Sequence, residues 1–571
     1  MLTLRDPAKE ALHLQAMPAR TSAPINPPTP TGPCPRRLAS ISVSRGFVLW
    51  ALVAIFTASA AAASASKPLS EIQLLGLLKG GVYANRVAVL VNQRGIDFIP
   101  TAQFLKSLRM AGANQKLLNA VKRARRIIPP TTIAQSPNNQ TNTGNTAENT
   151  QAESQQPPAT TALPVNDAIP PDTTITIQNW RQFQQFMPDG MTELFKGDHF
   201  WKVPSDLEIE VGPTTPEPLP TTYADATERY SRDVRVVHLP NGHNDVANYA
   251  GGEPFPNAEA PDKGYKLLVN LWFAYAPHLA VGTPHNPLTS CTQDRLGDIN
   301  CLKLNYVYRQ TAYNTDPRVG REAPGLRNTW FTEWVMVEKP EQSRYTAQLT
   351  IFPRDNQRNE DLYTFVPALR ISIRGSLSAR CSPVAGTDYI QDDYRNVGFN
   401  GGIGIFDAQF IGHRKILALT GNYAPLGGNF PDNYYMPLGW PKPSWGKWQL
   451  RDVDVIDVRR VPQEQKGYCY GKRIIYEDSV THYALWEDVY DLDMRLWKTA
   501  FAAQRLVNST SLGFVPGPVT SSIWDLRSGH MTNVSTEDEY GHDMLTNEDA
   551  PAEYQDFNGY STPGGLMEIM R

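Results

Sequence analysis

The sequence of 571 residues predicts an α+β protein that is mainly β, built on a large antiparallel sheet, with a small all-α unit near its N-terminus. Three observations predict this fold class. Between residues 174 and 571, short segments rich in β-branched and aromatic residues recur and are separated by turn residues. Few helical patterns lie between these segments, which favours antiparallel over parallel pairing. Residues 67–126 instead carry apolar residues at helical spacing.

Residues 1–66 are predicted to be a signal peptide or a membrane anchor. An apolar run of ten residues, Phe47–Phe56, follows a basic segment that ends at Arg45 and precedes a run of Ala and Ser. This order is typical of a secretory signal, and cleavage is expected after Ala60 or Ala65. An uncleaved anchor is the alternative, although the run reaches the roughly 20 residues of a membrane span only if the Ala/Ser tail is counted.

Residues 67–126 are predicted to form a small basic helical domain with about four short helices. Ser70 and Thr101 are suitable N-cap residues, and glycines follow where the helices are expected to end. The domain carries eleven Lys/Arg against two Asp/Glu, whereas residues 127–571 carry 37 against 53. The basic surface is expected to be a solvated face or, alternatively, to contact an anionic membrane surface or cell-wall polymer. The acidic balance of the main body gives no support to a nucleic-acid partner.

Residues 127–173 are predicted to be a disordered linker. Pro, Thr, Asn, Gln, Ser and Ala dominate this stretch, and it contains no aromatic residue. Such a composition cannot bury enough apolar area to offset the entropy lost on ordering. A flexible chain of this length would span about 35 to 40 Å on average.

The body, residues 174–571, is predicted to be a β-rich domain with a few short helices. Its strand-like segments are Lys266–Tyr275, Thr329–Glu338, Tyr345–Phe352, Leu362–Arg374, Ile411–Leu419, Trp448–Val458, Arg473–Tyr476 and Thr481–Glu487. Apolar residues at helical spacing predict helices over Asn179–Phe186 and Asp491–Val507.

One stretch of the body, Tyr363–Ile373, is predicted to supply a ligand-binding face. Its apolar residues share one parity and its polar and basic residues share the other, which is the period of a half-buried strand. Pro367 places the segment at a sheet edge or at a bulge. An acyl chain of about 14 methylenes bound to this face would gain on the order of 11 kcal/mol from desolvation. Filling of an ordinary core is the alternative. The predicted ligand-binding residues are Tyr363, Phe365, Leu369, Ile371 and Ile373.

The charged residues near this stretch form a predicted polar cluster. Arg370 and Arg374 lie on its polar face, and Asp388, Asp392 and Asp393 follow shortly afterwards. We expect these carboxylates to form structural ion pairs with the two arginines. The alternative is acid and base chemistry, because neighbouring carboxylates raise one another's pKa.

The sequence contains no recognised catalytic or cofactor motif. It has no nucleophile elbow, no phosphate-binding loop and no paired histidines at zinc spacing. We therefore expect no cofactor and no metal. The carboxylate cluster leaves a hydrolase of hydrophobic esters as the alternative to a protein without enzymatic activity.

Four cysteines in the body favour an oxidising compartment. Four cysteines allow three pairings, and the nearest-neighbour scheme joins Cys291 with Cys301 and Cys381 with Cys469. Four unpaired buried thiols are the alternative. No C-x-x-C pair is present, which argues against redox catalysis.

Several pieces of the body, taken in order, resemble one protein family. They are Asn248–Asn257 followed by Lys266–Asn270, Tyr363–Arg370 with Arg374, Gly386–Tyr389 with Asp392–Tyr394, and Lys472–Tyr476 followed by Leu496–Lys498. Together they resemble the bacterial domain-of-unknown-function family 1329, whose members look like the LolA and LolB carriers of outer-membrane lipoproteins. Ile371 stands where we expect a second basic residue after Arg370, which puts the role of that cation in doubt.

The resemblance implies a strongly curved, incompletely closed antiparallel barrel with covering helices and an apolar cavity. It also implies a periplasmic or outer-membrane-associated place, beside a transporter of the cell envelope. We therefore expect an exported protein that binds a lipid or another hydrophobic molecule without transforming it. A hydrolase and a structural partner of an outer-membrane machine are the alternatives.

Overall fold

The computed structural model describes most of the small helical domain, residues 67–126, and most of the body, residues 174–571. The described ranges are 68–79, 84–110, 113–124, 168–323, 325–326, 328–375, 380–393, 395, 399–421, 430–538 and 541–570. The predicted signal or anchor, residues 1–66, and residues 127–167 of the predicted linker lie outside these ranges. Within the described ranges, no helix is both long enough and apolar enough to cross a bilayer.

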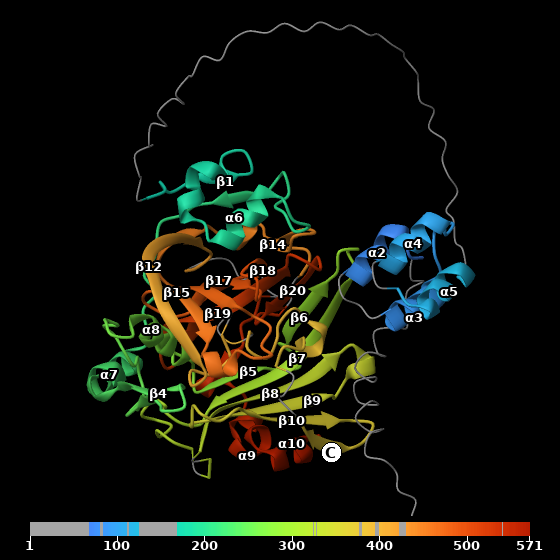
Figure 1. The fold of residues 1–571 in the computed structure, drawn as a ribbon. Helices are drawn as coiled ribbons and strands as arrows, with labels where there is room; N and C mark the ends of the chain where they lie inside the picture. Colours follow the sequence, from blue (N-terminus) through green and yellow to red (C-terminus); the bar gives the residue numbers. More distant parts are fainter. Residues whose placement is uncertain are drawn as a thin grey trace, which may run out of the picture. The chain divides into compact units, whose positions relative to one another are not determined.

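The described part of the N-terminal region consists of four short helices around a core of its own (Figure 1). The helices are α2 Glu71–Lys79, α3 Ala84–Arg94, α4 Ala102–Met110 and α5 Gln115–Arg123. Side-chain oxygens cap three of them: Ser70 accepts from the Gln73 amide at 3.3 Å, Thr101 from Phe104 at 3.1 Å and Asn114 from Leu117 at 3.0 Å. The predicted cap residues, Ser70 and Thr101, therefore do start helices.

The body is organised around one antiparallel sheet of 15 strands, which bends without closing into a barrel (Figure 1). The strands are β5 Leu279–Gly282, β6 Leu288–Gln293, β7 Ile299–Gln310, β8 Thr329–Lys339, β9 Ala347–Pro353, β10 Asp361–Val366, β11 Ile371–Arg374, β12 Phe406–Ala418, β15 Gln449–Arg460, β16 Lys472–Asp478, β17 Ala484–Tyr490, β18 Leu496–Ser509, β19 Gly513–Asp525, β20 His530–Ser535 and β21 Leu545–Thr546. Their order is β11-β10-β9-β8-β7-β6-β20-β19-β18-β17-β16-β15-β12, and β5 pairs with both β7 and β21.

Smaller elements complete the described part of the body. Three two-stranded ribbons pair β1 Thr174–Thr176 with β2 Glu208–Glu210, β3 Arg235–His238 with β4 Asn244–Ala247, and β13 Tyr434–Tyr435 with β14 Trp440–Pro441. The α-helices are α6 Asp189–Lys196, α7 Thr221–Tyr230, α8 Lys263–Trp272, α9 Phe557–Ser561 and α10 Pro563–Ile569. The 3-10 turns are η1 Trp180–Phe186, η2 Ser231–Asp233, η3 Glu341–Ser343, η5 Val384–Gly386, η6 Pro443–Trp445, η7 Pro462–Glu464, η8 Asn547–Asp549 and η9 Ala552–Gln555.

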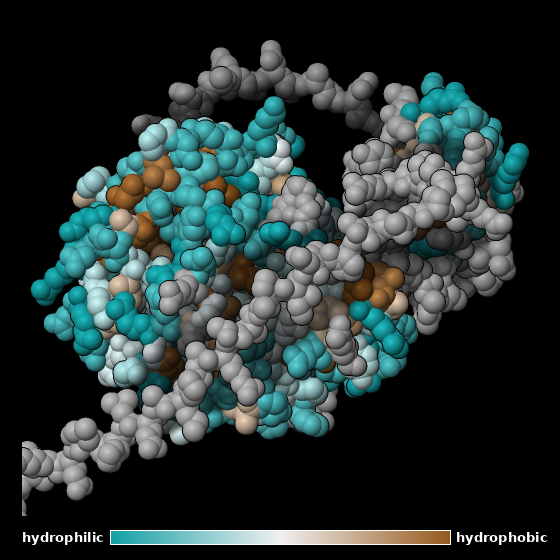
Figure 2. Space-filling view, turned by 90° about the horizontal axis from the view of Figure 1, so that it is seen from below, coloured by the Kyte–Doolittle hydropathy of each residue, from teal (hydrophilic) through white to brown (hydrophobic). Residues whose placement is uncertain are grey.

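Helices and loops cover the sheet on both sides. In Figure 1, α9 and α10 lie below β10, whereas α6 and β1 lie above β17 and β18. Helix α8 packs closely on β12, because a Cβ at Gly264 would lie 2.4 Å from the Ala408 carbonyl oxygen. Seen from below, the surface of the described residues is mostly hydrophilic, with separate small hydrophobic patches (Figure 2). The predicted class, mainly β with an antiparallel sheet, is confirmed.

Seven predicted strands overlap observed ones, but two elements of the body were assigned the wrong type. Lys266–Tyr275, predicted as a strand, lies largely in helix α8. That helix is buried on nearly all sides, so its apolar run lacks the alternation that separates helix from strand. Asp491–Val507, predicted as a helix, is mostly strand β18, whose two faces are both buried from Lys498 to Arg505. Its i, i+4 apolar spacing is therefore a by-product of burial on both faces.

The body begins before the predicted end of the linker. Ile169 is 6% exposed and belongs to the same core as Trp180 and Trp201. Asp172 forms an ion pair with Lys447. The predicted linker covered residues 127–173. Its last residues, from Ile169 onward, are thus part of the packed body.

Candidate functional site

The stretch Tyr363–Ile373 forms a hairpin instead of one strand. β10 ends at Val366, residues 367–370 turn, and β11 runs back antiparallel to β10. Tyr363 pairs with Arg374 across the hairpin. Directly paired residues point to the same face of a sheet. Odd-numbered residues of β10 therefore share a face with even-numbered residues of β11.

The predicted five-residue ligand-binding face is consequently split. Tyr363 and Phe365 point to the outer face, where Phe365 is 3% exposed and packs with residues of α9 and α10. Ile371 and Ile373 point to the opposite, inner face, and Leu369 lies in the turn with 48% of its surface exposed. The prediction of one shared face is wrong, because the two-residue alternation restarts after a turn.

The inner face of β7–β11 carries a surface of partly exposed apolar side chains, which we call the inner wall. One row of paired residues crosses all five strands, from Tyr306 through Val335, Gln348 and Thr364 to Ile373. Neighbouring strands lie about 4.8 Å apart, so this row spans roughly 19 Å. The inner wall consists of Leu302, Leu304, Tyr306, Val335, Val337, Leu362, Ile371 and Ile373.

Helices α9 and α10 cover the other face of these strands, through Val307, Trp334, Leu349 and Phe365. Apart from Tyr306, no member of the inner wall packs into a buried core of the described chain. Ile371 is 48% exposed and the other members are partly exposed. The inner wall is thus an apolar surface that the described body leaves without a full covering.

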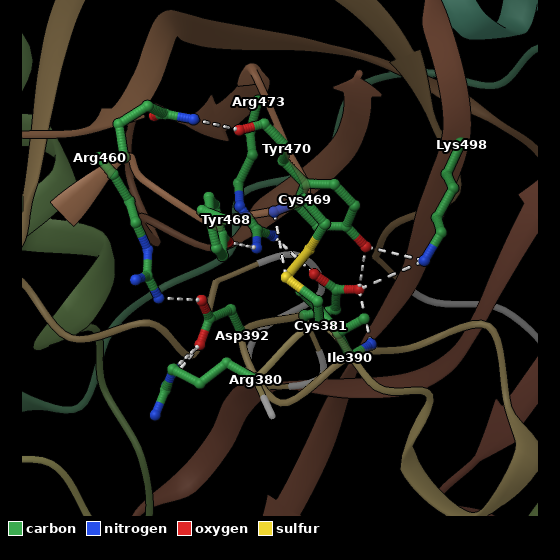
Figure 3. Close-up of a disulfide and its surroundings, with 12 residues drawn as sticks. Arg380, Cys381, Ile390, Asp392, Arg460, Tyr468, Cys469, Tyr470, Arg473 and Lys498 are labelled. Carbon is green, nitrogen blue, oxygen red and sulfur yellow. Dashed lines mark hydrogen bonds and ion pairs between the residues drawn. A yellow bond between two sulfur atoms is a disulfide. The ribbon is translucent and has the colours of Figure 1, made fainter. Parts of the chain in front are cut away.

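Two of the three predicted aspartates, Asp392 and Asp393, pair with arginines other than the predicted ones, and Figure 3 shows Asp392 between Arg380 and Arg460. Asp392 accepts from the Nε of Arg380 at 2.7 Å and pairs with Nη2 of Arg460 at 3.1 Å. Asp393 pairs with Nη1 of Arg473 at 2.8 Å and accepts from the Tyr470 hydroxyl at 2.8 Å.

Asp388 and the two predicted arginines lie apart from those pairs. Asp388 accepts from the Thr532 hydroxyl at 2.8 Å and lies 2.7 Å from Nδ1 of His530. Arg374 pairs instead with Asp361 of its own hairpin, and Arg370 sits in the turn with φ of +51°. The predicted pairing is wrong. The hairpin holds both arginines at the edge of the sheet, whereas the three aspartates lie in the loop that follows the hairpin.

Burial sets the electrostatics of this cluster. Burial raises the pKa of Asp392, but the charges of Arg380, Arg473 and Arg460 outweigh it and the net pKa is lowered. Glu487 lies 3.0 Å from Arg473, and burial raises the pKa of Glu487 to about 8. Arg473 and Glu487 were not predicted as members of the cluster, although a charge inside an otherwise apolar strand was a usable signal for each.

Both predicted disulfides are present, which confirms the nearest-neighbour pairing. Cys291 and Cys301 are directly paired residues of β6 and β7. Cys381 and Cys469 join the loop before the aspartates to the loop before β16 (Figure 3). In the chain-entropy model the two bonds would stabilise the fold by about 3 and 4 to 5 kcal/mol.

A groove and a small pocket lie on the described part of the body. A polar groove of about 710 Å³ lies beside α6 and is lined by Glu193, Lys196, Arg414 and Tyr490 among others. A narrow pocket of about 30 Å³ lies near Arg395. The described residues include no group of three or more side chains able to hold a metal ion.

A family model matches the sequence of the body. The model of DUF1329, a family described as a protein of unknown function, matches residues 174–562. The chain belongs to this family. The resemblance inferred from the four motifs is thereby confirmed. The match does not extend to the small helical domain, residues 67–126. No curated protein matches the sequence.

Solved structures similar to the chain include members of DUF1329 and of the LolA superfamily. One, described as an outer-membrane lipoprotein-sorting protein domain from Vibrio parahaemolyticus, is 13% identical with a TM-score of 0.36, covering 53% of this chain and 98% of its own. A DUF1329 protein from Desulfovibrio piger is 14% identical with a TM-score of 0.36, covering 53% and 100%. A LolA superfamily protein from Nitrosomonas europaea is 15% identical with a TM-score of 0.29, covering 50% and 92%.

Proposed function

We propose that the body binds a lipid or another hydrophobic molecule on the inner wall and carries it without transforming it. The observation that supports this proposal is the row of partly exposed side chains across β7–β11, whose other face is already covered by α9 and α10. Covering eight partly exposed apolar side chains would contribute on the order of 8 kcal/mol before the cost of ordering a ligand.

We further propose that the protein works in the bacterial envelope, in the periplasm or at the outer membrane. Two disulfides favour an oxidising compartment over the cytosol. The basic helical domain, residues 67–126, is proposed to contact an anionic membrane surface, and an envelope transporter is the proposed source or recipient of the ligand.

Lipid recovered with the purified full-length protein tests the proposal. Organic extraction and mass spectrometry are expected to recover bound lipid from the wild type. The double variant Val335→Asn, Ile373→Asn places amides on the inner wall, so bound lipid should fall at least about tenfold because amides are poorly solvated by hydrocarbon.

Ile411→Asn is the matched control for this experiment. Ile411 is an apolar residue of β12 at the far edge of the same sheet and is 57% exposed. Its replacement should leave the amount of bound lipid unchanged. Equal loss in the control and in the double variant, or full retention in both, would contradict binding at the inner wall.

A hydrolase of hydrophobic esters is the second candidate function. His530 is partly exposed and its Nδ1 lies 2.7 Å from Asp388, the orientation in which an imidazole can accept a proton at Nε2. Burial lowers the pKa of His530, but the hydrogen bond and charge of Asp388 outweigh it and raise the pKa. Recovery of cleaved rather than intact lipid, restored to intact lipid by Asp388→Asn, would favour the hydrolase.

A further inference from the structure

A buried cation lies at one end of the side-chain row of β8. Arg395 is 7% exposed, and its guanidinium carbon lies 4.9, 4.8 and 4.7 Å from the ring centres of Trp272, Trp330 and Phe331. Its Nη1 donates to the Trp272 carbonyl oxygen at 2.8 Å. Among the described residues, no carboxylate lies within 4.0 Å of this guanidinium. Aromatic faces stabilise the cation without neutralising it.

The same row connects Arg395 to the inner wall. Phe331, Glu333, Val335 and Val337 alternate along β8 and therefore point to one face. From Phe331 to Val337 this row is about 20 Å long. Arg395, which stacks on Phe331, thus lies at the end of the row opposite to the apolar members of the inner wall.

Glu333 lies within this row and is buried. It accepts a hydrogen bond from the Tyr306 hydroxyl at 3.0 Å. Burial raises the pKa of Glu333 and outweighs both that hydrogen bond and the charge of Arg395, so the neutral form of Glu333 is favoured more than in water. The carboxyl of Glu333 is thus a weaker source of repulsion for a second anion than an exposed glutamate would be.

A small polar pocket opens beside Arg395. Its volume of about 30 Å³ suits a group the size of one or two water molecules. The hydroxyl of Tyr275, a residue that is 4% exposed and lines the pocket, has no hydrogen-bond partner among the described residues. Asp316 also lines the pocket, but Nε of Arg318 donates to its carboxylate at 2.9 Å. Burial lowers the pKa of His278, the lining imidazole, which favours its neutral form.

We propose that Arg395 and the Tyr275 hydroxyl bind the carboxylate of a fatty-acid-like ligand whose hydrocarbon chain lies on the inner wall. This inference rests on the proposed function. A guanidinium matches the planar carboxylate with two parallel hydrogen bonds. The size of the pocket favours a bare carboxylate over the bulkier head group of a phospholipid.

Binding of palmitate and of hexadecanol to the full-length protein tests this inference, since the two probes share a chain and differ in the head group. The wild type is expected to bind palmitate at least about tenfold more tightly than hexadecanol. Arg395→Gln should remove this preference and leave hexadecanol binding unchanged. Tyr275→Phe, which keeps the ring, should weaken palmitate alone by a few fold.

Arg354→Gln is the matched control, because Arg354 also lies over an aromatic ring, that of Tyr313 at 4.8 Å, but is paired with Glu322. It should retain the preference for palmitate. Equal binding of the two probes by the wild type, a preference that survives in Arg395→Gln, or tighter binding of lysophosphatidate than of palmitate would overturn the carboxylate site. Failure of the wild type to bind either probe would instead contradict the proposed function.

Discussion

The two halves of the sheet treat their apolar faces differently. On β15–β20 one face is filled by aromatic rings. The ring centre of Trp440 lies 5.1 Å from that of Trp448, 5.7 Å from that of Phe501 and 6.0 Å from that of Trp524. Trp440 is fully buried, whereas Ile371 on the inner wall of the other half is 48% exposed. We infer that the two halves have different roles. The filled half stabilises the fold, and the inner wall is available to a ligand.

The filling comes from a particular segment of the chain. Residues 430–448, between β12 and β15, supply Trp440, Trp445 and Trp448 to one core with α6 and η1. On the other half, α9 and α10 cover the same face of the sheet, because Trp524 pairs through Met531 and Gln293 with Ile299, which shares a face of β7 with Val307. The halves differ on the opposite face: on β15–β17 it carries Ile456, Ile475 and Val489 of one core with α8, whereas on β7–β11 it is the inner wall.

The largest expected effect comes from emptying the filled half. Trp440→Ala should lower the free energy of unfolding by about 3 to 5 kcal/mol, because it leaves a large cavity among packed rings. Val337→Ala on the inner wall should cost about 1 kcal/mol or less, since that side chain is only partly buried. Urea unfolding of the two variants measures both values. Equal costs would remove the distinction between the halves.

A smaller, pH-dependent effect is expected from the charges inside the sheet. The pKa of Glu487 is about 8 in the folded protein and about 4.3 in an unfolded chain. Between these values the unfolded state binds fewer protons, so the stability that this group contributes falls as the pH rises. Glu487→Gln removes this pH dependence, because the amide of Gln does not titrate.

Urea unfolding at about pH 5 and about pH 8 measures this effect. The free energy of unfolding of Glu487→Gln, relative to the wild type, should increase by at least about 1 kcal/mol between the two pH values. A relative stability that stays constant or decreases would contradict the buried, partly protonated state of Glu487.

The sequence predicted the class of the sheet better than the faces of its strands. Alternation identified the apolar residues near Tyr363 but not the turn at residues 367–370, which reverses the chain and moves Ile371 and Ile373 to the inner face. Most of the inner wall was not predicted, because Leu304 and Val335 come from strands whose pairing only the folded sheet defines.

Buried charges limited the prediction of the polar cluster. The aspartates at 388, 392 and 393 were identified, but Arg460 and Arg473, which pair with Asp392 and Asp393, lie about 70 and 80 residues later. Sequence proximity favoured Arg370 and Arg374, whereas contacts across the sheet determine the pairs. The disulfide pairing was predicted correctly because nearest-neighbour pairing happens to hold for both bonds.

Photocrosslinking shows directly whether a hydrophobic ligand lies on the inner wall. A fatty acid carrying a diazirine on its chain, added to the full-length protein and activated by light, marks the side chains that touch the ligand. Binding on the inner wall predicts crosslinks in peptides that contain Leu304, Val337, Leu362 or Ile373, and their loss when unlabelled palmitate is added in excess. Crosslinks confined to the polar groove beside α6, or insensitive to that competition, would contradict it.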